Sequence, residues 1–349
     1  MASYSFANPW AAPGEFLKGN LHTHTTLSDG KESPEERAGR YRARGYDFLA
    51  LTDHGRIAPV GEIAVPDGLV LIPGAELHPP NPYKGEEYHL IALNISREIR
   101  TEGIAHPQEI LDAILDQGGV TFIGHPYWCK QSWTELAPLG GFLGVEVFNA
   151  TCRRIGREDS TAQWDEYLNR VALCCAIATD DCHKREEDRT DTYLGWIMLK
   201  SEKKDRDAIM EAIRRGAYYA SCGPEIRDLR VEETEKEGAR TIRIRVETSP
   251  ASGIAFVSDR GGARFGAFGA CDETEISCAE YTSVPQARYV RVEVMDRKGR
   301  KAWTNPVPVS GCSEGGGSPA VLAGLPAAAP WASVHLPSPG VTAPPRPAK

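Results

Sequence analysis

Several features that would point to other classes of protein are missing from this sequence of 349 residues. No apolar run approaches the ~20 residues that a membrane span needs, and the N-terminus has no basic segment followed by an apolar one, so we expect neither a membrane anchor nor a signal peptide. The nine cysteines include no Cys-x-x-Cys pair, which favours reduced thiols and a cytoplasmic protein. The net charge of −8 argues against extended nucleic-acid binding, but it does not exclude a small phosphorylated substrate.

Composition and pattern divide the chain into four parts. Residues 1–16 have no regular pattern and form an irregular lead-in. Residues 17–223 alternate short apolar strands with helical segments, whereas 224–309 contain only short β-type runs separated by turns. Residues 310–349 are rich in Pro, Ala, Gly and Ser with little charge, so we expect a disordered tail. The sequence therefore predicts a large α/β domain followed by a small antiparallel β-sandwich.

Explicit start and stop signals predict the helices of the first domain. Ser33, Pro34 and Glu36 have the spacing of a capping box, and the helix they begin should end near Arg44. Similar patterns predict helices at 107–117, 160–170 and 204–215. Continuous apolar strands between helices are typical of parallel β/α units, and about seven of them favour closure into a barrel.

The first strand of this domain carries a His-x-His motif. Residues i and i+2 of a strand point to the same side, so His22 and His24 can present two imidazoles to one point. Asp29 follows in a Ser-Asp-Gly turn, from which its carboxylate can approach the same strand end. Two imidazoles and a carboxylate are suitable ligands for zinc, manganese or iron.

Further histidines and carboxylates follow later strands, where the functional side chains of a barrel gather. They are His54, Glu76, His125, Asp181 and His183, and His89 lies in a further apolar run at 88–93. Together with the first three they make nine potential ligands, too many for one ion. Nine ligands suit two or three divalent ions that share a bridging carboxylate.

The ordered motifs LHTHTTLSDG, LTDHG, PGAE, GHP and DDCH closely resemble those of the PHP (polymerase and histidinol phosphatase) family over residues 17–223. The resemblance implies a distorted seven-stranded (β/α)7 barrel with a trinuclear metal site. It assigns one ion to His22, His24, Glu76 and Asp181, a second to Glu76, His89 and His125, and a third to Asp29, His54 and His183. The C-terminal β-region with its WTNP stretch is similar, more loosely, to the carbaryl-hydrolase-like branch of the family.

Some neighbouring residues have more than one interpretation. His78 lies two residues after Glu76 and competes with His89 as a ligand, or else binds substrate. Asp53 is better placed to orient a ligand or cap a turn than to bind metal. Glu146 and Asn149 end a strand and are candidates for lining the pocket.

The expected substrate site lies beside the metal ligands. Arg153, Arg154 and Arg157 precede a helix that Ser160 is expected to cap, and an arginine fork near a helix N-terminus suits a phosphate or carboxylate. Solvent exposure without a role is the alternative for each arginine. The pair Tyr127 and Trp128 either stacks on a substrate ring or covers the barrel mouth.

These observations predict an enzyme, a metal-dependent hydrolase acting on a small phosphate ester or nucleotide through a hydroxide that bridges two ions. We expect His183 or the carboxylate of Asp181 to steer the leaving-group proton, and Arg157 to bind the phosphoryl oxygens. Hydrolysis of a carbamate, ester or amide on the same cluster is the alternative reaction. A non-catalytic, metal-stabilised binding module is the alternative outside enzymes.

Overall fold

The computed structural model describes residues 4, 6–83, 86–188, 190–260 and 275–309. The predicted tail at 310–349 lies outside the described residues. Nine strands belong to the region expected to form the barrel: β1 (Glu15–Asn20), β2 (Phe48–Leu51), β3 (Val70–Leu77), β4 (Leu90–Leu93), β5 (Val120–Ile123), β6 (Gly144–Asn149), β7 (Cys175–Thr179), β8 (Trp196–Ser201) and β9 (Tyr218–Ser221). The strands β2, β4, β5, β6 and β7 are buried along their whole length, as their continuous apolar character predicts.

The strand directions differ from those of a regular β/α barrel. Strands β1–β2–β3 and β5–β6–β7 are parallel, but β4 is antiparallel to both of its neighbours and β8 is antiparallel to β1. The segment from 78 to 89, which joins β3 to β4, contains no described helix. A parallel neighbour needs a long crossover connection, usually a helix, whereas an antiparallel neighbour can follow after a short loop. The expectation of seven parallel β/α units is therefore wrong for this part of the sheet.

No described ladder closes the sheet into a barrel. The hydrogen-bonded order runs β8-β1-β2-β3-β4-β5-β6-β7, and β7 and β1 are linked only by an isolated bridge between Thr23 and Cys182. That bridge lies just beyond the two strand ends. It brings together the loops that follow β1 and β7.

The described helices are α1 (Pro34–Ala43), α2 (Pro107–Leu115), α3 (Trp133–Leu136), α4 (Thr161–Arg170) and α5 (Arg206–Arg214). The predicted capping box at Ser33 and Glu36 is confirmed. The predicted Ser160 cap is wrong, because the Ser160 hydroxyl accepts a hydrogen bond from the Tyr127 amide (3.2 Å) and does not bond to α4. Within the described ranges, no helix has the length and apolar character needed to cross a membrane.

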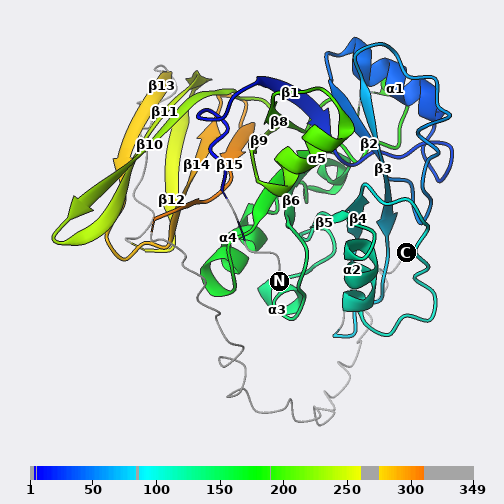
Figure 1. The fold of residues 1–349 in the computed structure, drawn as a ribbon, viewed down its shortest axis with the longest axis horizontal. Helices are drawn as coiled ribbons and strands as arrows, with labels where there is room; N and C mark the ends of the chain where they lie inside the picture. Colours follow the sequence, from blue (N-terminus) through cyan, green and yellow to red (C-terminus); the bar gives the residue numbers. More distant parts are fainter. Residues whose placement is uncertain (1–3, 5, 84–85, 189, 261–274, 310–349) are drawn as a thin grey trace, which may run out of the picture. The chain divides into compact units, whose positions relative to one another are not determined.

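The C-terminal strands form two packed layers (Figure 1). One is a three-stranded antiparallel sheet of β10 (Ile226–Lys236), β11 (Ala239–Ala251) and β13 (Ile276–Thr282). The other contains β12 (Gly253–Ser258), β14 (Tyr289–Met295), β15 (Lys301–Thr304) and β16 (Val307–Pro308). A shared apolar core, including Ile244, Val246, Phe256 and Val292, lies between them.

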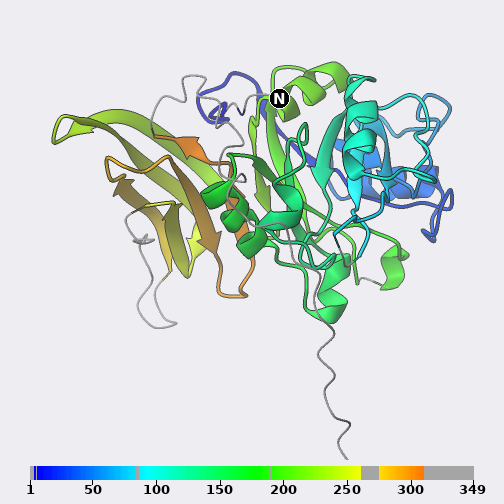
Figure 2. The same ribbon diagram turned by 90° about the horizontal axis from the view of Figure 1, so that it is seen from below.

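The second layer is not a separate sheet. Strand β15 pairs with β9, with Trp303 opposite Ala220, so the large sheet runs on into the C-terminal region (Figure 2). The Asn305 side chain strengthens this junction: its oxygen accepts from the Ala176 amide (2.9 Å), and its amide group donates to the carbonyls of Gly216 and Tyr218 (both 3.1 Å). The β-sandwich therefore shares one of its layers with the large sheet of the first domain.

Candidate metal centre

A single buried carboxylate occupies the centre of the site. Glu76, near the end of β3, is 1% exposed. Six imidazole nitrogens lie within 3.5 Å of its oxygens: His89 (2.7 Å), His54 (2.9 Å), His125 (3.3 Å), His78 (3.4 Å), His22 (3.5 Å) and His24 (3.5 Å). Such crowding around one carboxylate is what a ligand shared between ions requires.

Backbone hydrogen bonds between neighbouring loops bring these side chains together. The Asp181 amide donates to the carbonyl of His22 (2.9 Å), and the His24 amide donates to that of Cys182 (3.0 Å). Residues His54 and Glu76 form a parallel bridge. The loop after β1 is thus joined to the loop after β7, and the loop after β2 to the end of β3, which places their ligands in one group.

The two histidines of the His-x-His motif face each other. Their Nε2 atoms are 3.1 Å apart, and Oδ1 of Asp181 lies 2.9 Å from His24 Nε2 and 3.3 Å from His22 Nε2. Two imidazole nitrogens at this distance can share at most one proton. With Glu76 they form a buried group of four possible ligands.

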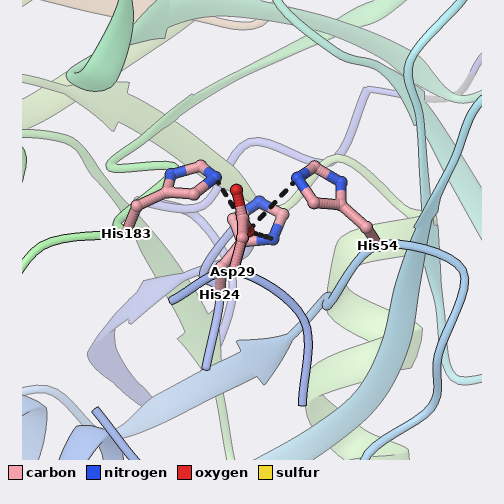
Figure 3. Close-up of side chains that lie close together, drawn as sticks. All are labelled: His24, Asp29, His54 and His183. Carbon is pink, nitrogen blue, oxygen red and sulfur yellow. Dashed lines mark ion pairs between the residues drawn. The ribbon is translucent and has the colours of Figure 1, made fainter. Parts of the chain in front are cut away.

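A second group surrounds Asp29 at the more exposed side of the site (Figure 3). The Asp29 carboxylate lies 3.4 Å from His54 Nε2, 3.4 Å from His183 Nε2 and 4.0 Å from His24 Nδ1. The Nδ1–H of His183 donates to the backbone carbonyl of Asp181 (2.7 Å), which leaves Nε2 free to face Asp29.

Two further groups share Glu76. One contains His89 and His125, and the other contains His54 and His78. His89 is the closer neighbour of the carboxylate, and it also lines the main cavity, whereas His78 is not among the residues that line it. The geometry therefore favours His89 for the ligand position over which the two histidines compete.

Two of the ligand candidates have strained backbones. His125 has a φ of 23° and Asp181 a φ of 52°, values that non-glycine residues rarely adopt. Each such residue typically costs on the order of 1–3 kcal/mol and is retained where the surrounding structure demands it. Each is the second residue after a strand, β5 for His125 and β7 for Asp181, and each side chain belongs to the site.

The donor set fits divalent cations. Four buried atoms of the site have no hydrogen-bond partner among the described residues, namely His24 Nδ1, His54 Nδ1, His78 Nε2 and Asp181 Oδ1. His54 Nδ1 lies 2.9 Å from Glu76 without the geometry of a hydrogen bond. Unsatisfied buried nitrogen and oxygen atoms that converge at such distances are expected of metal ligands.

The charges of the site are strongly coupled. Burial alone would raise the pKa of Glu76, but His89 and His22 beside it hold that pKa well below its usual range. Burial disfavours the charged form of His22, yet Asp181, Glu76 and Glu146 raise its pKa well above the usual value. Burial lowers the pKa of His24 to about 4, so this imidazole stays neutral and able to bind metal.

Glu146, in β6, forms hydrogen bonds that fix the positions of the ligand residues. Its oxygens receive hydrogen bonds from His22 Nδ1 (3.0 Å), the His125 amide (2.8 Å), the Asn149 side chain (2.8 Å) and the Thr179 hydroxyl. Because the carboxylate only accepts, His22 must carry its proton on Nδ1 and present Nε2 to the site. The sequence made Glu146 a candidate for lining the pocket. Its hydrogen bonds to the ligands have no signal in an otherwise apolar strand.

Asp53 and Asp180 also support the site. Asp53 accepts hydrogen bonds from the amide and hydroxyl of Thr25 (2.7 and 2.8 Å) and from those of Ser28 (3.1 and 2.7 Å). It therefore fixes the turn that carries Asp29, as expected. Asp180 accepts from the Tyr41 hydroxyl (2.6 Å), and burial raises its pKa to about 6.

Comparison with known proteins gives partial matches. No protein-family model matches the chain. The chain is 40% identical over 83 residues to a 5'-3' exoribonuclease of Haemophilus influenzae, a match that covers 23% of this chain and 30% of that protein. It is 28% identical over 173 residues to an uncharacterized protein of Methanocaldococcus jannaschii, covering 45% and 90% of the two chains. The chain thus spans less than a third of the exoribonuclease.

One similar solved structure is a two-domain protein of Bacteroides vulgatus described as containing a predicted PHP-like metal-dependent phosphoesterase. The TM-score is 0.49 and the identity 18%, with 88% of this chain and 99% of that chain covered.

The cavity above the ligands has a volume of about 380 Å³. Of the predicted substrate residues, Arg154 and Trp128 line it. Arg157 instead lies over the Tyr127 ring, 5.4 Å from its centroid, and neither residue is among those lining the cavity. Arg153 lines a different cavity, next to β15.

Two cationic residues of the cavity wall, Lys31 and Lys184, were missed by the sequence reasoning. Each directly follows a ligand motif, at SDG and DDCH, and this adjacency was the available signal.

Proposed function

We propose that this chain is a metal-dependent hydrolase of phosphate esters, of the PHP type. The observation that carries the proposal is the buried Glu76 with six imidazole nitrogens within 3.5 Å. A carboxylate and histidines in this number serve no packing purpose, since buried polar groups without partners are costly. They are suited to hold two or three divalent ions.

The residues that would hold the ions fall into three groups around Glu76 and Asp29. They are His22, His24, Glu76 and Asp181; Glu76, His89 and His125; and Asp29, His54 and His183. Divalent ions in such a site supply Lewis-acid activation of water and of the phosphoryl group. Glu146 and the Asp181 carbonyl fix which nitrogen His22 and His183 present to the site.

His183 and Asp29 border the cavity and lie on the side open to solvent. We propose that His183 is a ligand through Nε2 and does not steer the proton of the leaving group, because its Nδ1–H already donates to the Asp181 carbonyl. The Asp181 carboxylate, almost fully buried, is then a ligand and not a proton donor.

Three cationic residues in the cavity wall favour a phosphate ester over a neutral carbamate, ester or amide. These are Lys31, Arg154 and Lys184. Arg154 replaces Arg157 as the proposed contact to the phosphoryl oxygens, because only Arg154 lines the cavity. Two of the relatives are named as 5'-3' exoribonucleases, and RNA is itself a phosphate ester, which supports a phosphate ester as the substrate class.

The test is a hydrolysis screen of the metal-replete protein over aryl phosphates, nucleotides, short oligonucleotides and aryl carbamates. We expect turnover of at least one phosphate ester and its loss after chelation. Turnover of carbamates or carboxylic esters alone would replace the proposed reaction with its alternative. Full metal content with no turnover of any substrate would favour a binding module.

A further inference from the structure

Three cations of the cavity wall make no ion pair with any acidic residue in the described part of the chain. These are Lys31, Arg154 and Lys184. Arg154 belongs to the 3₁₀ turn η1 (Thr151–Ile155), while the two lysines come from the loops that carry Asp29 and His183. The positive charge on the lysine side of the wall therefore remains available to a ligand.

The glutamates that lie close to the two lysines in the sequence are paired with arginines. Glu32, next to Lys31, pairs with Arg37 (3.0 Å) and Arg40 (2.8 Å). Glu186, two residues after Lys184, pairs with Arg40 (2.8 Å) and Arg44. Since these carboxylates face helix α1, they do not neutralise the lysines at the cavity.

Hydrogen bonds hold the two lysine-bearing loops together. The Lys31 amide donates to the carbonyl of His183 (2.9 Å), the residue before Lys184. Asp191 accepts from the amides of His183 (3.2 Å) and Lys184 (3.3 Å). The two lysines therefore belong to adjoining backbone segments that are held together by hydrogen bonds. Both segments lie on the side of the cavity that contains Asp29 and His183.

We infer that Lys31 and Lys184 form an anion subsite that selects phosphate monoesters, the more highly charged class, over diesters and neutral substrates. This inference deepens the proposed function and rests on it. A phosphate monoester carries up to two negative charges near neutral pH, a diester carries one and an aryl carbamate none. Lysine ammonium groups act as hydrated point charges, so they discriminate by total charge more than by shape.

The experiment compares Lys31→Met, Lys184→Met and the double variant in the metal-loaded full chain. Binding of inorganic phosphate is measured by calorimetry, and kcat/KM is measured for an aryl phosphate, an aryl phosphodiester and an aryl carbamate. Lys236→Met, an exposed lysine of β10, is the matched control. Metal content is measured for every variant.

We expect each single substitution to weaken phosphate binding about tenfold and the double variant by about a hundredfold, the usual size of a charge-assisted contact. The aryl phosphate should lose kcat/KM to a similar degree, the diester less and the carbamate not at all. Arginine at both positions should restore most of the binding. Unchanged phosphate affinity in the double variant would overturn the subsite, as would an equal loss for the carbamate.

Failure of the subsite can be told apart from failure of the proposed function. Lysine-dependent phosphate binding in a protein that hydrolyses no phosphate ester would support the subsite and contradict the reaction. Normal hydrolysis of monoesters by the double variant would support the reaction and contradict the subsite.

Discussion

Glu76 and Arg291 are both about 1% exposed, yet the two regions treat these buried charges in opposite ways. In the C-terminal region, Arg291 of β14 makes two hydrogen bonds to Asp165 of α4 (2.8 and 2.7 Å) and one to Glu293 (3.1 Å). Its charge is balanced by carboxylates within the fold. Within the described ranges, the Glu76 carboxylate is hydrogen-bonded to His89 and His125 only. Three nitrogen atoms of the other imidazoles around it have no partner among the described residues, namely His24 Nδ1, His54 Nδ1 and His78 Nε2.

The difference distinguishes a structural charge from a ligand. A buried ion pair is complete in itself, and its loss leaves a partner uncompensated. A cluster of histidines and carboxylates with unsatisfied atoms is complete only when cations from outside join it. Substitutions in the two regions should therefore have different signatures: loss of metal and activity in one, loss of stability alone in the other.

The largest effect is expected for Glu76→Gln. Loss of the shared carboxylate should disturb more than one ion and lower kcat/KM for the best phosphate ester by roughly a hundredfold or more. Elemental analysis and steady-state kinetics measure the two effects. Glu235→Gln, at an exposed position of β10, is the control and should change neither. If the Glu76→Gln variant kept full metal content and activity, Glu76 would not be a ligand shared between ions.

Chelation of the metal should lower the free energy of unfolding. If the free ion is present at a thousand times its dissociation constant, binding to the folded state alone contributes about 4 kcal/mol. Thermal or urea unfolding before and after chelation measures the loss. The Glu76→Gln variant should lose much less on chelation, and an equal loss in both proteins would mean that the stabilising ion binds elsewhere.

Glu146→Gln should weaken metal binding by roughly 10- to 100-fold, the usual effect of changing a residue that hydrogen-bonds to a metal ligand. A glutamine keeps the shape, but its amide group would face a donor at His22, His125, Asn149 or Thr179. Titration against a chelator of known affinity gives the change. Unchanged affinity together with lower stability would make Glu146 a packing residue only.

The smallest effect is expected in the other region. Asp165→Ala leaves the buried Arg291 with Glu293 as its carboxylate partner, and removal of such charge-assisted hydrogen bonds typically costs on the order of 1.5–3 kcal/mol. Urea unfolding measures this cost. Metal content and kcat/KM should not change, and a parallel loss of metal would erase the distinction between the regions.

Elements with local signals could be predicted from the sequence. The capping box at Ser33 and Glu36 and the apolar strand at 120–123 depend on neighbouring residues and appear where expected. The direction of β4 could not be predicted, because four apolar residues read the same in a parallel and an antiparallel strand. The pairing of β15 with β9 joins residues about 80 positions apart, which no local pattern encodes.

The ligand candidates were recognisable because histidine is scarce and each one lies in or close to the end of an apolar strand segment. The structure brings all nine together with His78 as a tenth neighbour. The wall of the cavity was harder to predict. Nothing in the sequence distinguishes Arg154 from Arg157 as a substrate contact. In the structure Arg154, in the turn η1, lines the cavity, whereas Arg157 lies over the Tyr127 ring.

The number of divalent ions per chain tests the central claim most directly. Elemental analysis of the full chain, purified after metal-replete expression and without chelators, should give two to three ions per chain. The same analysis of Glu76→Gln should give at least one fewer. A value of one ion or less in the unmodified chain would contradict a shared-carboxylate metal centre.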